Sequence, residues 1–193
     1  MNSNFRLITK CLLLQSNYFF IENKSNSIKN NSLLISNKFM YYLSLHLRLS
    51  SLTYTTQLVD IFCYELPNTI KSNNNKSSSS VVVYNFNSFL NQDRIFVFCS
   101  NFKKSSVSRS LINESVSLNS ISEIFSSANW LERENSELHG VNFSGKKDLR
   151  NLLLQYGDSS FPFQKSFPSI GLKEMFFNPI KDTLIQSNIS LQI

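Results

Sequence analysis

The sequence predicts an α+β fold, because strand-like runs fill its first half and a helical pattern follows them. The runs 81–90 and 94–100 are rich in β-branched and aromatic side chains and are separated only by Asn-Gln-Asp, which is typical of an antiparallel strand pair. From residue 118 the apolar residues recur at helical spacing. Residues 158–171 hold two Pro and three Phe without any period, so we expect an irregular, extended segment near the C-terminus.

The first half of the chain predicts strands and one helix. Residues 5–22 predict two short strands, with a transit peptide as the open alternative at the start, and a polar loop follows at 23–32. Residues 32–49 are apolar over a helical length, and Ser32 is a residue type that caps helices, so this stretch predicts a helix. Residues 55–66 predict a strand that Pro67 ends, and the Ser- and Asn-rich residues 68–80 predict a long loop.

The second half predicts two helices and a weakly patterned tail. Residues 101–115 are a polar connection, and 118–138 predict a helix whose apolar stripe packs on the sheet. That stripe is formed by Ile121, Ile124, Phe125, Ala128, Leu131 and Leu138. A shorter helix is expected at 149–156, capped by Asp148 and ended by Gly157. The chain thus divides into an N-terminal α/β part (1–116), a helical region (117–171) and a tail (172–193).

Trp130 is the only tryptophan, and it falls roughly 150° from the centre of the apolar stripe on helical geometry. It shares the polar face with Glu123, Ser127, Glu134 and Glu137, and the core of this chain explains such a position poorly. Trp and Arg are enriched at interface hot spots, so the position favours contact with a partner. The alternatives are that Trp130 lies flat on the surface, or that the helix ends before it.

The net positive charge of the chain is compatible with a nucleic-acid partner. The chain carries a net charge of +6 with a pI near 9.3, and its Asn-, Ile- and Lys-rich composition resembles that of AT-rich organelle genes. The basic residues are scattered, and the longest basic runs are pairs, whereas a phosphate-binding surface usually needs a denser patch. An organellar ribosomal protein is therefore the alternative function.

No catalytic or metal-binding motif stands out. The three cysteines, Cys11, Cys63 and Cys99, are far apart and form no CxxC pair, so we expect buried thiols and no cluster site. His46 and His139 have no triad partners in an evident pattern. No phosphate-binding glycine motif and no apolar run of membrane-spanning length are present. These features favour a non-catalytic protein.

Residues 126–171, SSANWLERENSELHGVNFSGKKDLRNLLLQYGDSSFPFQKSFPSIG, resemble the C-terminal motif of the 30-kDa subunit family of respiratory complex I, in its mitochondrially encoded form. The family pattern is A-x-W-x-E-R-E, an acidic residue, G, F, D-L-R, Y-G, P, K, F-P and G. The chain departs from it at Glu137 and His139, and at Lys146-Lys147 in place of His-Pro. It also departs at Asn151, Ser160, Gln164 and Ser166.

The resemblance implies a mixed sheet with helices packed on it, in a structural subunit of the peripheral arm on the matrix side of the mitochondrial inner membrane. It implies no cofactor in this chain, because iron–sulfur clusters and FMN belong to partner subunits. The expected partners are other complex I subunits, above all the 49-kDa-type quinone-site subunit and the iron–sulfur subunits. Nucleic acid, a membrane span and self-association are not expected. The expected partner-interface residues are Trp130, Glu132, Arg133, Glu134, Glu137, Asp148, Arg150, Tyr156, Pro162, Lys165, Phe167 and Pro168.

Overall fold

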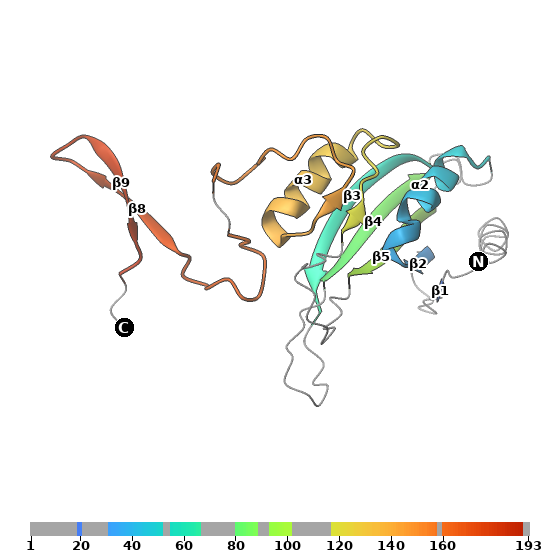
Figure 1. Ribbon diagram of the computed structural model, residues 1–193, viewed down its shortest axis with the longest axis horizontal. Coiled ribbons are helices and arrows are strands. Elements are labelled where there is room, and N and C mark those ends of the chain that lie inside the picture. The colour runs from blue at the N-terminus through green and yellow to red at the C-terminus, as the bar shows by residue number, and fades with distance from the viewer. Residues whose placement is uncertain are drawn as a thin grey trace, which may run out of the picture.

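A computed structural model describes residues 19–20, 31–51, 55–66, 80–88, 93–101, 117–157 and 160–190. Its main element is a mixed sheet of five strands in the order β1-β2-β5-β4-β3 (Figure 1). The strands are β1 (Phe19–Phe20), β2 (Asn31–Ile35), β3 (Thr55–Glu65), β4 (Ser80–Ser88) and β5 (Asp93–Asn101). Strands β2 and β5 run parallel, and the other neighbours are antiparallel.

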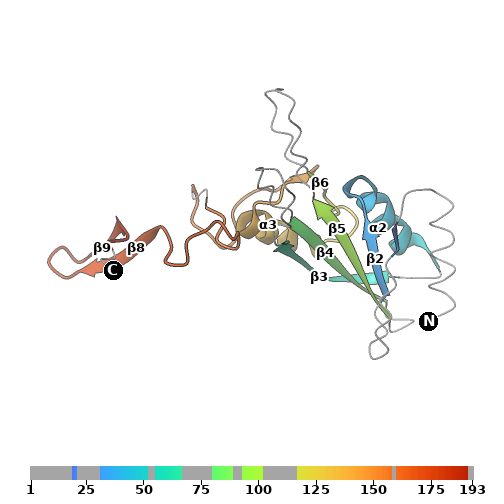
Figure 2. The same ribbon diagram turned by 90° about the horizontal axis from the view of Figure 1, so that it is seen from below.

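One hydrophobic core lies on one face of the sheet. Alternate residues of β4, namely Val82, Tyr84 and Phe86, are fully buried there. Helix α2 (Met40–Leu49) adds Met40, Leu43 and Leu47 to the same cluster, and the region around helix α3 (Ala128–His139) adds Ile121, Phe125 and Ala128. Both helices therefore cover the same face, where α2 contacts β3 and β6 (Leu118–Asn119) and α3 lies along β3 (Figure 2).

The central strands confirm the sequence analysis. The expected strand 55–66 is β3, and the expected pair 81–90 and 94–100 is the antiparallel pair of β4 and β5. The expected loop at 68–80 lies almost wholly outside the described residues, as does most of 5–22, of which only β1 is described.

The expected helix at 32–49 is wrong in its first part. Residues 31–35 form β2, the short 3-10 turn η1 (Asn37–Phe39) follows, and α2 begins at Met40, so Ser32 caps no helix. Leu33 and Ile35 face the core, in register with Val97 and Cys99 of β5. The backbone hydrogen bonds of a parallel pairing outweigh the helical pattern of the apolar residues here.

The expected helix at 118–138 begins ten residues later than the pattern indicates. Residues 118–119 form strand β6, which pairs in parallel with β7 (Phe143–Ser144), and turns lead from there into α3. The apolar stripe is nevertheless confirmed, because Ile121, Phe125 and Ala128 are buried and Ile124 and Leu131 pack against the core.

The expected helix at 149–156 is wrong, because these residues form a run of turns and bends. The tail, for which the sequence analysis predicted no element, contains a hairpin of β8 (Lys173–Asn178) and β9 (Thr183–Asn188). The hairpin lies apart from the sheet in both views (Figures 1 and 2), and the irregular coil 160–171 leads to it, as expected.

Gly140 ends α3 in a left-handed conformation with φ of 70°. A Cβ atom there would lie 2.9 Å from Nε2 of Gln164 and 3.1 Å from the Phe161 ring. Only glycine combines this backbone conformation with such a close approach. The coil 160–171 is thereby seated directly on the end of α3.

Candidate partner interface

Glu132 and Lys146 form a buried ion pair on the inner side of α3. The Nζ of Lys146 lies 3.1 Å from Oε2 of Glu132, and the two side chains are 1% and 0% exposed. The Glu132 carboxylate also accepts hydrogen bonds from the Ser120 hydroxyl at 2.7 Å and the Ile121 N–H at 2.8 Å. Lys146 donates further to the backbone and side-chain oxygens of Asn129. Each charge is therefore compensated inside the domain.

Arg133 holds the coil that follows β7 against α3. Its guanidinium donates to the carbonyl oxygens of Arg150 at 2.8 Å and Asn151 at 3.2 Å, and it lies 3.4 Å from a carboxylate oxygen of Asp148. Asp148 also pairs with the Arg150 side chain at 2.9 Å. Hydrogen bonds from the side chain and then the backbone N–H of Arg150 hold the pKa of Asp148 well below its ordinary range, despite some desolvation.

Glu137 binds the same coil through its backbone. Its carboxylate accepts the N–H groups of Leu152 and Leu153, each at 2.9 Å, and that of Leu154. Burial opposes ionisation of this carboxyl, but the three N–H donors together with Arg133 outweigh it, so the pKa of Glu137 lies below its ordinary value of 4.5. The expected helix is absent here because a side chain of α3 satisfies the backbone N–H groups of Leu152–Leu154.

Acid is expected to release this coil. Because the pKa of Glu137 is lowered in the folded chain, its contribution to stability is complete above the ordinary glutamate pKa and is lost as pH falls through the lowered value. We expect the amides of Leu152, Leu153 and Leu154 to lose exchange protection as the pH falls below the ordinary glutamate value of 4.5, after correction for intrinsic exchange. In Glu137→Gln these amides should already be less protected at neutral pH, and their protection should change little with acid. Full protection of the wild-type amides through that range would contradict the assignment.

These contacts show what two of the expected interface residues do within the domain. Glu132 and Glu137 are buried, and their carboxylates bind backbone N–H groups of this chain. The helix geometry placed Glu137 on the polar face, but the coil 146–157 covers it. The other expected residues keep accessible surface. Trp130, Arg150, Tyr156, Lys165 and Pro168 are exposed, and Arg133, Glu134, Asp148, Pro162 and Phe167 are partly exposed.

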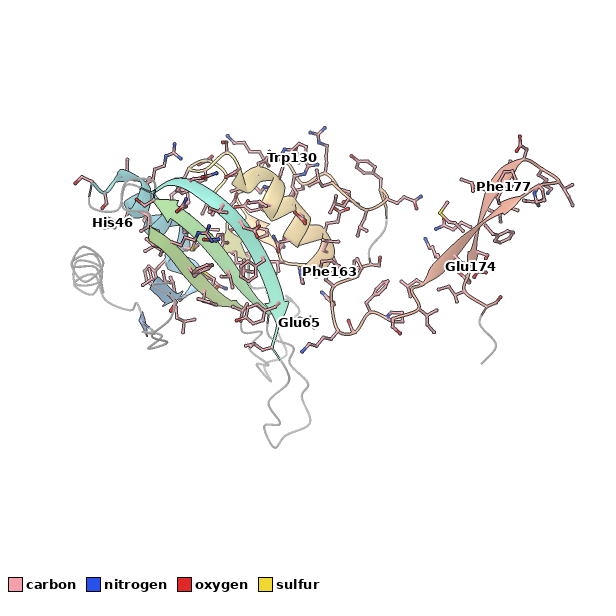
Figure 3. The ribbon with its side chains drawn as sticks, turned by 180° about the vertical axis from the view of Figure 1, so that it is seen from behind. His46, Glu65, Trp130, Phe163, Glu174 and Phe177 are labelled. Carbon is pink, nitrogen blue, oxygen red and sulfur yellow. The ribbon has the colours of Figure 1, made fainter. Side chains whose placement is uncertain are left out.

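Large apolar side chains are exposed on α3 and on the coil beyond it. Trp130 is 64% exposed, and Figure 3 shows it on the outer side of α3. The sequence analysis missed Leu149 and Leu153, because it placed them in a helix that does not form. The exposed set between 130 and 163 comprises Trp130, Leu149, Leu153, Tyr156, Phe161 and Phe163.

The hairpin carries a second exposed apolar set. Met175 and Phe177 share one face of β8, and Leu184 of β9 is paired directly opposite Phe177. Phe176 and Ile185 occupy the other face, and Ile180 at the turn is 92% exposed. Figure 3 shows Phe177 and Glu174 on the hairpin, well separated from α3. Contiguous exposed apolar surface marks an interaction site, and the apolar run from Met175 to Phe177 is the signal that could have revealed it from the sequence.

Neither the described cysteines nor the histidines form a reactive group in this structure. Burial raises the pKa of the Cys63 and Cys99 thiols to about 12, so both are inert small hydrophobic residues at neutral pH, while Cys11 lies outside the described residues. His139 stacks edge-on against Phe163 with ring centroids 5.3 Å apart, and burial lowers its pKa. His46 lies exposed on α2. Among the described residues no three His, Cys, Asp or Glu side chains gather as a metal site.

A membrane-crossing helix is not found in the described part of the chain, since neither α2 nor α3 is long and apolar enough.

Comparison with known proteins points to one family. The family model described as the respiratory-chain NADH dehydrogenase 30 Kd subunit matches residues 40–172. NADH-ubiquinone oxidoreductase subunit 9 of Paramecium primaurelia is 40% identical over 61% of this chain and 51% of its own length, so the chain spans about half of that relative. The Acanthamoeba castellanii protein of the same name is 32% identical over 87% of this chain and 76% of its own length.

The fold also matches a solved structure. A chain of the membrane-bound sulfane sulfur reductase, an archaeal respiratory membrane complex, superposes with a TM-score of 0.63 over 87% of this chain and 88% of its own. With 15% identity, this likeness concerns the fold alone. The family matches lend no support to the ribosomal alternative.

Proposed function

The chain belongs to the respiratory-chain NADH dehydrogenase 30-kDa subunit family, and on that premise we propose that it is a non-catalytic structural subunit of mitochondrial NADH:ubiquinone oxidoreductase. Its place is the peripheral arm on the matrix side of the inner membrane, where it stabilises the quinone-reducing module and so supports electron transfer from NADH to ubiquinone. The names of the relatives support the complex and the organelle, one of them being a mitochondrial NADH dehydrogenase protein of Candida albicans.

The observation that carries the proposal is the extended C-terminal segment. Residues 160–171 pack on the end of α3, and residues 172–190 then lead away from the domain and form a two-stranded hairpin that exposes Met175, Phe177 and Leu184. A two-stranded hairpin is at best marginally stable alone in water, and exposed apolar area of this extent is unusual for a monomer. A second protein that covers the hairpin would stabilise its two strands and would remove its apolar side chains from water.

Trp130 marks a second contact. Its indole is exposed on the outer face of α3, while Glu132 and Arg133 from the same turn hold the domain together. The motif residues thus build a rigid support, and Trp130 projects from it. We propose the 49-kDa-type quinone-site subunit as the protein that buries this side chain, with iron–sulfur subunits as further neighbours of the C-terminal segment.

We propose that the chain holds no cofactor of its own, and that clusters and flavin belong to its partners. The two described thiols support this, because burial keeps them protonated and they lie in the core. Elemental analysis of the purified full chain should find no stoichiometric iron, and one or more iron atoms per chain would overturn the proposal.

The test is native electrophoresis of solubilised mitochondrial membranes, with mass spectrometry of the band that holds NADH dehydrogenase activity. The wild-type chain is expected in that band, and Trp130→Ala should weaken its incorporation at least tenfold, because a buried interface Trp contributes about 2 kcal/mol or more. Tyr42→Ala is the matched control, since Tyr42 on α2 has the same exposed fraction of 64%. A wild-type chain that migrates with ribosomes instead would overturn the proposal.

A further inference from the structure

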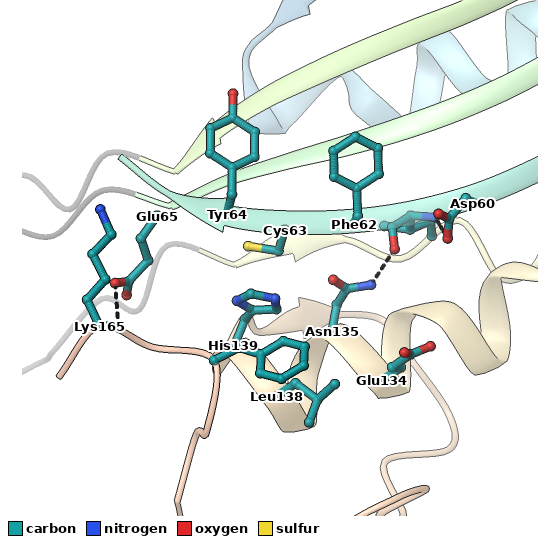
Figure 4. Close-up of a pocket in the computed structure, with 12 residues that line it drawn as sticks. Asp60, Phe62, Cys63, Tyr64, Glu65, Glu134, Asn135, Leu138, His139 and Lys165 are labelled. Carbon is teal, nitrogen blue, oxygen red and sulfur yellow. Dashed lines mark hydrogen bonds between the residues drawn. The ribbon is translucent and has the colours of Figure 1, made fainter. Parts of the chain in front are cut away.

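A groove of about 550 Å³ runs along the outer edge of the sheet. Residues 60–65 of β3 form one wall, and the C-terminal half of α3 with residues 163 and 165 forms the other (Figure 4). Strand β3 ends the sheet in the described structure, because it pairs only with β4. The groove therefore gives access to an edge strand, a feature that soluble proteins usually cover.

Side chains close only part of this edge. The outward N–H of Ile61 donates to the Asp60 carboxylate at 2.8 Å, and the Ile61 carbonyl accepts from Asn135 Nδ2 at 2.7 Å. Backbone direction alternates along a strand, and the register from Asp60 to Glu65 is regular, so Cys63 also presents its N–H and C=O outward. The described residues provide no backbone or side-chain partner for these two Cys63 groups. Free edge groups of this kind are available to another strand.

The chemistry of the walls indicates what kind of strand fits. Leu138, Phe163 and the His139 ring make an apolar floor, and the Nδ1 atom of His139 has no hydrogen-bond partner among the described residues. Figure 4 shows Cys63 directed toward His139, whereas Phe62 and Tyr64 point to the other side of the sheet.

The groove is also acidic. Its carboxylates are those of Asp60, Glu65 and Glu134, and Lys165 supplies the one lysine or arginine of the lining. Burial lowers the pKa of His139, so this ring adds no positive charge at neutral pH. The excess of negative charge favours a basic occupant, because complementary charge sets the orientation and the choice of partner.

We propose that this groove binds an extended, basic segment of a neighbouring subunit, which pairs as an added strand with the free edge of β3 at Cys63. Main-chain hydrogen bonds supply the pairing, an apolar side chain enters between Leu138 and Phe163, and Lys or Arg side chains face the carboxylates. This inference rests on the proposed function, because it takes another subunit of the complex as the partner.

Amide hydrogen exchange tests the proposal, measured on the peptide that covers residues 61–66 in the free full chain and in the assembled complex. Pairing should slow exchange of the Cys63 amide at least tenfold on assembly. Glu134→Lys should restore fast exchange, since it places a positive charge on the groove wall. The matched control is Glu123→Lys, at an exposed glutamate outside the groove that pairs with Lys147 at 3.7 Å. This control should leave the protection intact.

Carbodiimide coupling of the complex identifies the occupant. A bond from Glu65 or Glu134 to a lysine of another subunit supports the proposal, and a bond to a second copy of this chain overturns it. Equal exchange at 61–66 in the free chain and the complex also overturns it, even where Glu134→Lys proves unstable. Because the presence of the chain in the complex is measured separately, a chain that assembles without protection at 61–66 refutes the groove alone.

Discussion

Replacing Lys146 by Met is expected to lower the free energy of unfolding by about 3–5 kcal/mol, because it leaves a buried carboxylate without its cation. Glu132 is wholly inaccessible, and after the substitution only the Ser120 hydroxyl and the Ile121 N–H remain to stabilise its charge. Met retains most of the aliphatic volume of Lys, so the loss reflects charge and hydrogen bonding more than packing. Urea unfolding of the full chain, followed by far-ultraviolet circular dichroism, measures the effect.

Two variants separate charge burial from other causes. Lys147→Met changes the neighbouring lysine, whose side chain is 89% exposed beside Glu123, so stability should change by no more than about 0.5 kcal/mol. Replacing Glu132 by Leu in the Lys146→Met background removes the stranded charge and should recover at least half of the loss, since an apolar pair of similar volume often substitutes well for a buried ion pair. A Lys146→Met chain as stable as Lys147→Met would contradict the described burial.

The ion pair shows where sequence reasoning about the site ends. The concentration of charge at residues 132–137 indicated a special region, and helical geometry placed Trp130 on the exposed side, as the structure has it. A helical wheel predicts only the side of α3 on which each side chain lies. It could not reveal that Lys146 and the backbone of Leu152–Leu154 return to Glu132 and Glu137, because those contacts depend on the path of an irregular coil.

The fold likewise has elements that the sequence predicts and elements that depend on pairing with distant segments. Strands β3, β4 and β5 were predictable because they are runs of β-branched and aromatic residues. Burial alternates along β5, whereas residues 81–84 of β4 are all buried. Leu33 and Ile35 fit a helical and a strand pattern equally well, and only the parallel partner β5 selects the strand. Likewise Ile121 and Phe125 have helical spacing, but turns and the pairing of β6 with β7 bury them without a helix.

Replacing Met175, Phe177 and Leu184 together by Ser is expected to weaken incorporation into the complex at least a hundredfold while the domain stays folded. Each of these side chains is more than half exposed, and burying one fully contributes about 1.5–3 kcal/mol, so even partial burial of three by a partner exceeds the roughly 2.7 kcal/mol of a hundredfold change. The hairpin lies apart from the sheet, so the thermal midpoint of the free chain should not move.

The matched control replaces Tyr42, Leu45 and Leu49 by Ser, which removes exposed apolar side chains of α2 on the main domain. Native electrophoresis with quantitative mass spectrometry should show normal incorporation of this control and loss of the hairpin variant. Equal incorporation of the two would mean that the hairpin contributes nothing to assembly. Loss of the hairpin variant alone would mean that the hairpin anchors this chain in the complex. The core of the domain contains no residue of the hairpin, so residues 173–188 are left for a neighbouring subunit to bury.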